Sequence, residues 1–211
     1  MTSTLIQQAS RWALPRETAA GAARRCEFHA QQINAICAIN SSAHILSVAC
    51  GRMPEASLSS AVQHRFFGRL VGVDPDEQAL AEVSQTLGHL GVETIRGSAQ
   101  TILSWSRELG HFDFIYSDGL YEAFDERFCR RLTRMLFEML HPGGRLLAGN
   151  FLSFSKGGHS VSRRDGSAVY GRTPSTMQRL AADIPSHWLG AVHAFVAPCQ
   201  TAVYLDLLRR S

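Results

Sequence analysis

The chain has 211 residues, of which 45% are apolar, and its formal net charge is +3 at pH 7. These values are typical of a single globular domain with a substantial core. The arginines are scattered over the expected helices and do not form one basic run. The sequence therefore lacks the concentrated positive charge that is typical of nucleic-acid-binding proteins.

Cysteine usage and hydropathy indicate the compartment. The five cysteines are an odd number and contain no C-x-x-C pair, so we expect neither a disulfide framework nor a bound metal. The segment "MTSTLIQQASRW" lacks the charged start and apolar core of a signal peptide, and no apolar run approaches the ~20 residues that span a bilayer. We therefore expect a cytoplasmic protein without a membrane span.

The first 42 residues are alanine-rich and read as helical. In "RRCEFHAQQINAICAI" apolar residues such as Cys26, Ala30 and Ile33 recur at roughly helical spacing. We expect residues 1–42 to form a lid or a dimer surface, and residues 43–211 to form the main domain.

From residue 44 short apolar runs alternate with amphipathic patterns. The expected strands are 44–50, 69–74, 92–97, 112–119 and 145–152. The expected helices between them are 54–67, 74–91, 99–109 and 125–140. The sequence "HPGG" after the last of these helices is expected to be a sharp stop and turn. Strands that alternate with helices predict a parallel sheet covered on both faces.

The pattern changes after residue 152. Residues 153–172 are polar and glycine-rich without a clear period, which is typical of a functional or disordered loop. A short helix is predicted to resume with Thr173 as its N-cap and Pro174 at its first position. The runs "WLGAVHAFVAP" and "TAVYLDLLRR" predict a terminal hairpin, so we expect a doubly wound, mostly parallel seven-stranded sheet with an antiparallel last strand.

The loops at the carboxyl ends of the strands are where such sheets bind ligands. Asp74 ends the second strand, 23 positions after Gly51, where a carboxylate can accept hydrogen bonds from both hydroxyls of a ribose. Asp74, followed by Pro75, is also well placed to cap the next helix, so both interpretations stay open.

The loop Ala49-Cys50-Gly51 contains one glycine and lacks the G-x-G-x-x-G pattern of dinucleotide sites. A pyrophosphate needs that open turn lined with amides, whereas a nucleoside without phosphates tolerates a single glycine. The loop therefore argues against a nicotinamide-dependent oxidoreductase. It leaves a smaller nucleoside cofactor, a non-catalytic nucleoside-binding module or a plain turn.

Two further loops carry candidate polar groups. Ser98, between Gly97 and Ala99, could meet an adenine edge or simply cap a helix. After the fourth strand, "IYSDGLYEAFDE" is expected to bring a second group of side chains to the mouth of the site, although its acids also favour a helix N-terminus. These side chains are Tyr116, Ser117, Asp118 and Tyr121.

The order and spacing of five segments carry a family resemblance. The segments "HILSVACG", "RLVGVDPD", "VETIRGSA", "HFDFIYSDGLYEAF" and "LHPGGRLLAGNF" resemble the consecutive motifs of class I S-adenosylmethionine-dependent methyltransferases, over about residues 44–152. More narrowly, "IYSDGLYEAF" and "PGGRLLAGNF" resemble bacterial enzymes that form the methyl ester of 3-hydroxypalmitate. The chain departs from the family at Ser47 and Ser98, where acidic residues are common, and at Ala49, the place of the first glycine.

The resemblance implies a Rossmann-like methyltransferase fold, S-adenosyl-L-methionine as cofactor and a cofactor site on four loops. The loop after the first strand would line the methionine part, Asp74 would hold the ribose, the third loop would meet the adenine, and Ser117 would lie under the sulfonium. The implied cofactor residues are Ala49, Cys50, Gly51, Asp74, Pro75, Gly97, Ser98, Ala99 and Ser117.

Methyl transfer from a sulfonium is a direct displacement that chiefly needs alignment and exclusion of water. A carboxylate acceptor needs no base, whereas a hydroxyl or amine could use one of the candidate catalytic residues. These are Asp118, Tyr121 and His159. The candidate substrate-binding residues are Tyr116, Asn150, Arg163 and Arg164, because arginine forks match carboxylates, although a solvated basic loop explains the two arginines equally.

These observations predict O-methylation of a carboxyl or hydroxyl group on a small molecule in secondary or signalling metabolism. The expected partner is a small-molecule substrate and not a nucleic acid, and a homodimer is left open. An Asn/Asp-Pro-Pro-Tyr/Phe loop, which would hold a nucleic-acid base, is absent from the sequence.

Overall fold

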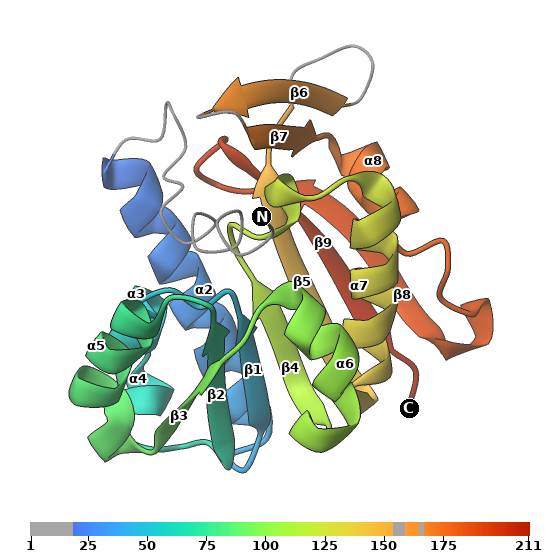
Figure 1. Cartoon of the computed structure of the whole chain (residues 1–211). Helices are drawn as coiled ribbons and strands as arrows, with labels where there is room; N and C mark the ends of the chain where they lie inside the picture. Colours follow the sequence, from blue (N-terminus) through green and yellow to red (C-terminus); the bar gives the residue numbers. More distant parts are fainter. Residues whose placement is uncertain (1–18, 154–158, 165–166) are drawn as a thin grey trace.

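The structure, a computed structural model, describes residues 19–153, 159–164 and 167–211. Its centre is a seven-stranded sheet in the order β3-β2-β1-β4-β5-β9-β8 (Figure 1). The first five strands are parallel, β9 is antiparallel to β5, and β8 pairs with β9 as a hairpin. The strands are β1 His44–Val48, β2 Arg69–Asp74, β3 Val92–Arg96, β4 Phe112–Ser117, β5 Leu140–Phe151, β8 Leu189–Val196 and β9 Ala202–Arg209. The predicted doubly wound sheet with its terminal hairpin is confirmed.

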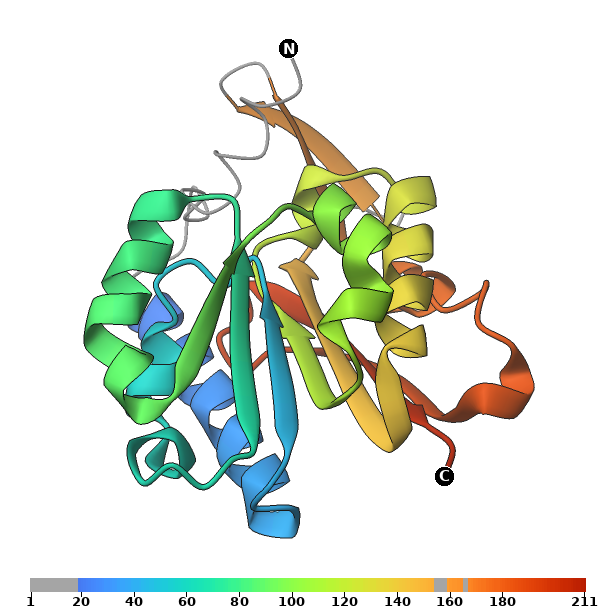
Figure 2. The same ribbon diagram turned by 60° about the horizontal axis from the view of Figure 1, so that its bottom comes forward.

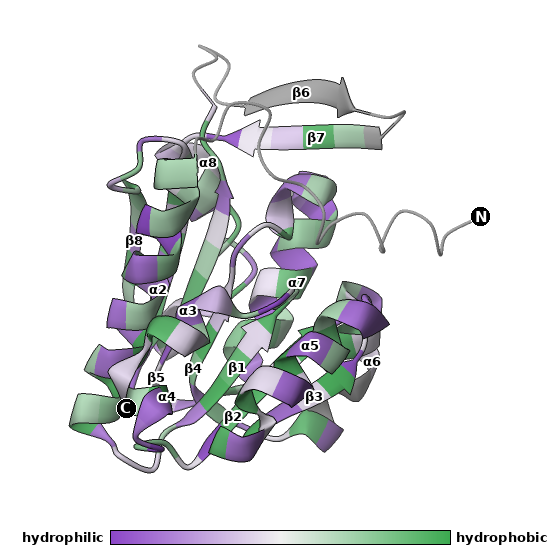
Figure 3. Cartoon of the chain, turned by 90° about the vertical axis from the view of Figure 1, so that its left-hand side faces the viewer, coloured by the Kyte–Doolittle hydropathy of each residue, from purple (hydrophilic) through white to green (hydrophobic). Residues whose placement is uncertain are grey.

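Helices cover both faces of this sheet (Figure 2). One buried cluster lies under α2 Ala19–Ile39, α3 Pro54–Leu58, α4 Ser60–Gln63 and α5 Glu77–Leu87. The other lies under α6 Ala99–Leu109, α7 Glu126–Glu138 and α8 Pro174–Arg179. The described residues also contain the single 3-10 turns η2 Gly88–Leu90, η3 Tyr121–Ala123 and η4 Ser186–Trp188. The central strands β1 and β4 are hydrophobic along most of their length, whereas the helices alternate between hydrophobic and hydrophilic residues (Figure 3).

Local capping explains where the helices begin. Asp76 caps α5 by accepting hydrogen bonds from the amides of Gln78 and Ala79, so this helix starts two positions after the predicted Asp74-Pro75. Thr173 caps α8 with Pro174 at its first position, as predicted. The predicted helix 54–67 is broken into α3 and α4 at Ser59, whose hydroxyl caps the second piece.

Two predictions from local sequence are wrong. The "HPGG" segment is not a stop before β5 but lies inside it, where the pairing with β4 shifts register and Gly143 has φ 78°. A bulge absorbs residues that elsewhere signal a turn. The segment 153–172 is not structureless, because it forms a separate antiparallel pair, β6 His159–Arg164 and β7 Ser167–Arg172, beside the main sheet (Figure 1).

Helix α2 is tightly joined to the sheet. The ring of Phe28 lies 5.1 Å from that of Tyr204, and the His29 ring stacks on Tyr116 at 5.3 Å between centroids. The Asn34 side chain accepts hydrogen bonds from the Ser59 hydroxyl and from a backbone amide of α4. Residues 1–18 lie outside the described part of the chain, and the division at residue 42 stays a prediction. Among the described helices, none has the length and apolar content that a bilayer crossing requires.

Candidate functional site

The predicted cofactor residues come together at one edge of the sheet. Val48, the last residue of β1, pairs with Val73 on one side and with Ser117 on the other. The loops that follow β1, β2, β3 and β4 therefore begin at the same level. The carboxyl ends of parallel strands are where doubly wound sheets hold their ligands.

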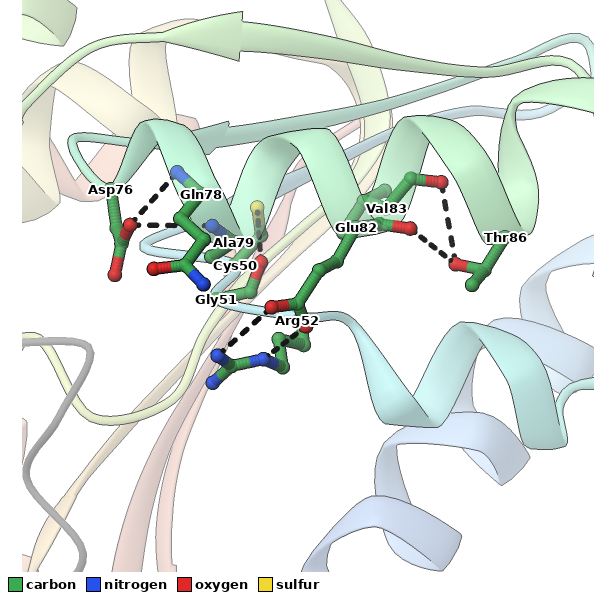
Figure 4. Close-up of polar contacts among 9 residues, drawn as sticks. All are labelled: Cys50, Gly51, Arg52, Asp76, Gln78, Ala79, Glu82, Val83 and Thr86. Carbon is green, nitrogen blue, oxygen red and sulfur yellow. Dashed lines mark hydrogen bonds and ion pairs between the residues drawn. The ribbon is translucent and has the colours of Figure 1, made fainter.

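The loop after β1 folds over β2. The amide of Cys50 donates a hydrogen bond to the carbonyl of Val73 at 3.1 Å, and the amide of Gly51 donates to Asp74 Oδ2 at 2.8 Å. Figure 4 shows the next residue, Arg52, paired with Glu82 of α5. These contacts fix the loop on the neighbouring strand before any ligand binds.

This fold-over packs against a glycine that sequence reasoning missed. A Cβ on Gly72, in the middle of β2, would lie 2.7 Å from Met53 Sδ and 2.8 Å from Cys50 Sγ. Even an alanine there would force these two side chains to move. A single glycine within an apolar run was the only signal available.

The same loop contains residues in the left-handed region. Ala49 has φ 57°, Gly51 has φ 52° and Met53 has φ 48°. Nothing lies within 4 Å of the position that a Cβ on Gly51 would occupy, so the space beside the loop is open. A side chain at these φ values costs about 1–2 kcal/mol, which glycine avoids.

We expect Gly51→Ala to lower the free energy of unfolding by about 1 kcal/mol, because no clash adds to the backbone cost. Ala49→Gly is expected to be neutral or to raise it by up to about 1 kcal/mol, because the strain disappears while unfolded-state entropy offsets part of the gain. Urea unfolding of both variants measures the two effects. Equal losses in both variants would contradict the left-handed assignment of Ala49.

Asp74 is fully buried, and its carboxylate holds the two loops together. Oδ2 accepts from the Gly51 amide, and Oδ1 accepts from the Asp76 amide, each at 2.8 Å. Burial raises the pKa of Asp74, and the two amides oppose this shift. A carboxylate offers about four acceptor positions, so two remain for a ligand. Pro75 is half-buried beside it.

The loop after β3 is organised around a helix cap. The amide of Gly97 donates to the carbonyl of Asp74, and the Ser98 hydroxyl accepts from the Thr101 amide in a capping box. Ala99 is buried under this turn. Ser98 therefore caps α6, which was one of its two predicted roles. The contact of Ser98 with an adenine stays a prediction.

After β4, Asp118 is joined to α2. Its Oδ2 lies 2.7 Å from Arg25 Nη1 and 3.5 Å from His29 Nε2. Burial raises the pKa of Asp118, but the hydrogen bond from His29 and the guanidinium of Arg25 outweigh this effect and lower the pKa to about 2. Such a carboxylate is a weak base, and it fixes α2 against the strand end.

The two tyrosines of this region point into the core. The Tyr116 hydroxyl donates to Glu55 Oε1 at 2.8 Å on the α2 face, and the Tyr121 hydroxyl lies 3.1 Å from Thr133 Oγ1 on the α7 face. Burial raises the pKa of both phenols. Their predicted substrate-binding and catalytic roles are not supported by these positions and stay predictions.

Asn150 belongs to a buried cluster around Arg172, a residue that the sequence did not single out. Arg172 Nη1 donates to Asn150 Oδ1 at 2.6 Å and to the Tyr121 carbonyl at 2.8 Å, and Nη2 donates to the Phe124 carbonyl at 2.7 Å. Asn150 in turn donates to the carbonyl of Tyr170. This cluster ties the end of β7 and the end of β5 to the turn η3.

The remaining candidates lie on β6. His159 pairs with Arg172, Arg163 with Ala168, and Arg164 with Ser167 along the β6–β7 ladder. Their side chains lie outside what the structure describes, so their catalytic and substrate-binding roles stay predictions. Groups of three or more residues able to hold a metal ion are absent from the described part of the chain.

Comparison with known proteins adds a family match. Residues 45–144 match the family model described as a methyltransferase domain. This segment runs from β1 into β5 and contains all four strand-end loops. A search of curated proteins finds no match to the chain.

Solved structures share the fold at low identity. A protein from Bordetella parapertussis, described as a possible exported protein, is 15% identical over 100% of this chain and 80% of its own, with a TM-score of 0.68. An S-adenosylmethionine-dependent methyltransferase from Mesorhizobium loti is 15% identical over 80% of this chain and 91% of its own, with a TM-score of 0.58. The magnesium protoporphyrin IX methyltransferase of Synechocystis, solved with bound S-adenosylhomocysteine, is 12% identical over 100% of this chain and 95% of its own, with a TM-score of 0.61.

Proposed function

We propose that this chain, whose residues 45–144 match a methyltransferase-domain model, transfers the methyl group of S-adenosyl-L-methionine to a small molecule. The observation that carries the proposal is that the domain match spans the four loops gathered at the carboxyl edge of the sheet. The chain is an enzyme, and S-adenosyl-L-methionine is its cofactor. When bound, the cofactor supplies a methyl group that is already activated as a sulfonium.

The residues at this edge fit such a cofactor. The space beside Gly51 is open, and Asp74 keeps two acceptor positions for ribose hydroxyls. The Ser117 hydroxyl is buried and lacks a hydrogen-bond partner in the described structure, as expected for a group that awaits a ligand. We assign the adenine end to Gly97, Ser98 and Ala99. We assign the methionine end to Ala49, Cys50 and Ser117.

The acceptor that we propose is a carboxyl or hydroxyl oxygen, and a hydroxy fatty acid is the first substrate class to test. Asp118 is a weak base because Arg25 and His29 hold its charge, which suits a carboxylate acceptor that needs no base. Arg163 and Arg164 are proposed to hold the substrate carboxylate, and His159 is proposed as the base if the acceptor is a hydroxyl. We further propose that α2 acts as a lid or dimer surface and that the protein works in the cytoplasm.

Calorimetric titration of the purified chain with S-adenosylhomocysteine and, separately, with NADH tests the cofactor. We expect saturable binding of S-adenosylhomocysteine alone. Asp74→Asn is expected to weaken it about tenfold, since a charged acceptor contributes about 1.5–3 kcal/mol and the amide keeps part of it. Asp183→Asn, an exposed carboxylate paired with Arg130, is the matched control and should bind normally.

Binding of NADH alone, or of neither compound, would overturn the proposal. Once binding is established, candidate acceptors are screened by following the formation of S-adenosylhomocysteine. Hydroxy fatty acids and their methyl esters form an informative pair, because blocking the carboxyl should abolish turnover if that oxygen is the acceptor.

A further inference from the structure

Glu122, in the turn η3, is a buried carboxyl whose hydrogen-bonding capacity is largely unused. It is fully buried, and neither Oε1 nor Oε2 has a hydrogen-bond partner in the part of the chain that the structure describes. Buried carboxyl groups are normally paired or hydrogen-bonded, because an unpaired one loses its hydration without compensation. A partner from outside the chain would explain both vacant oxygens.

The carboxyl lies over the loop that follows β4. Oε1 is 3.6 Å from the position that a Cβ on Gly119 would occupy, so the side chain folds back toward the strand end. Ser117, two residues before Gly119, carries the second vacant polar group of this loop, its buried hydroxyl. Two unpaired acceptors therefore occur within one short loop at the proposed site.

The charges around Glu122 are already engaged with other groups. From α2, Arg25 and His29 contact Asp118, the acidic neighbour of Glu122. From β7, Arg172 donates its hydrogen bonds to two carbonyls and to Asn150, and no described carboxylate lies within ion-pair distance of it. Glu122 is thus the group in this cluster that can accept a new donor.

The strand order indicates which part of the cofactor reaches this loop. The proposed function assigns the ribose to the end of β2 and the adenine to the end of β3. In the order β3-β2-β1-β4, β4 lies two strands from β2. Strands are about 4.8 Å apart, so the end of β4 lies roughly 10 Å from Asp74. An amino-acid tail attached to the ribose through sulfur has the length to cross β1 and end near β4.

We propose that Glu122 accepts hydrogen bonds from the α-ammonium group of the cofactor, with the Ser117 hydroxyl as a second acceptor. The proposal rests on the proposed function. An ammonium carries three N–H donors and no acceptor, which complements vacant carboxylate oxygens, whereas a sulfonium carries no N–H donor. The ammonium is therefore the cationic group that the vacant oxygens fit.

The electrostatics of the site support this assignment. Burial raises the pKa of Glu122 to about 8 and Asp118 raises it as well, whereas the backbone amide of Glu122 itself, Arg25 and Arg172 oppose the shift. At pH 7 the carboxyl of the free protein is therefore mostly neutral. An ammonium that binds it favours the ionised form, so binding is expected to release a proton.

Titration calorimetry with two ligands tests the proposal. S-adenosylhomocysteine carries the ammonium, whereas 5′-methylthioadenosine keeps the adenosine and the sulfur without it. Each ligand is titrated at pH 7 into the wild-type full chain and into the Glu122→Gln variant. The titrations are made in phosphate and in Tris, because the different ionisation enthalpies of the two buffers reveal how many protons are released on binding. We expect Glu122→Gln to weaken S-adenosylhomocysteine about tenfold or more and to leave 5′-methylthioadenosine within about twofold. The wild-type chain should release roughly one proton with the first ligand only.

Two further variants keep the test decisive. Ser117→Ala leaves no partner unsatisfied and should also weaken only the ligand with the ammonium. Glu126→Gln, an exposed acid in the first turn of α7, should change neither ligand. Equal weakening of both ligands, or unchanged binding without proton release, would overturn the inference. Failure of the wild-type chain to bind either ligand would overturn the proposed function, and the inference with it.

Discussion

Replacing Arg172 by methionine is expected to lower the free energy of unfolding by about 3–5 kcal/mol. Arg172 is 3% exposed, and its guanidinium donates hydrogen bonds to the carbonyls of Tyr121 and Phe124 and to Asn150 Oδ1. Methionine fills much of the same volume but leaves these three acceptors without their donor. Each unsatisfied buried acceptor costs about 1–3 kcal/mol, and relaxation of the turn recovers part of the sum. Urea unfolding followed by circular dichroism measures the loss.

The matched control for this substitution is Arg130→Met. Arg130 forms an ion pair with Asp183 at the surface, and both side chains are more than a third exposed. Surface pairs of this kind contribute about 0–1 kcal/mol, so the control should remain close to the wild-type chain. A loss in Arg172→Met no larger than in the control would mean that the hydrogen bonds of Arg172 do not hold η3 in the folded state.

The sheet could be predicted because its strands are short apolar runs separated by amphipathic helices. The runs around Ile45 and Val71 become the fully buried centre of the sheet. The pair β6–β7 could not be predicted in this way. It lies outside the main sheet, and residues such as Ser160 and Gly171 interrupt any hydrophobic period. Pairing in this hairpin depends on main-chain hydrogen bonds that leave no hydrophobic signature.

The positions of the candidate site could be predicted more fully than its contacts. Strand order alone brings the loops at Gly51, Asp74 and Ser117 to one edge. The partners of Asp118 could not be predicted, since Arg25 is 93 positions away in the sequence and meets it only because α2 packs on the sheet. The role of Arg172 could not be predicted either, because its partners are distant in the sequence and the residue is one basic side chain in a polar segment.

The loop after β4 connects these separate observations. Its first half is held by α2 through Asp118, and its second half is held by β7 through Arg172. Glu122 lies between Tyr121 and Phe124, whose carbonyls Arg172 holds, and its side-chain oxygens have no hydrogen-bond partner in the described structure. A ligand that pairs with Glu122 would thus bind to a loop whose ends are already fixed, which limits the entropy lost on binding.

Glu122 should also make the stability of the ligand-free protein depend on pH. Its pKa is 4.5 in an ordinary environment, and burial raises it to about 8 in the folded chain. Between these values the folded chain binds more protons than the unfolded chain, so the free energy of unfolding falls as the pH rises. The stability is fully present below about pH 4.5 and is lost progressively as the pH rises through 8. From pH 6 to pH 9 we expect this group to remove about 2–3 kcal/mol.

Comparison with Glu122→Gln isolates this effect from all other titrating groups. Glutamine keeps the shape of the side chain without an ionisable proton, so the wild-type chain should lose about 2–3 kcal/mol relative to the variant between pH 6 and pH 9. Urea unfolding at several pH values measures the difference. Saturating S-adenosylhomocysteine should reduce it, because the ammonium would then stabilise the ionised carboxyl. Parallel pH profiles of the two ligand-free proteins would mean that Glu122 is ionised at neutral pH in the folded chain, with Arg25 and Arg172 compensating its charge.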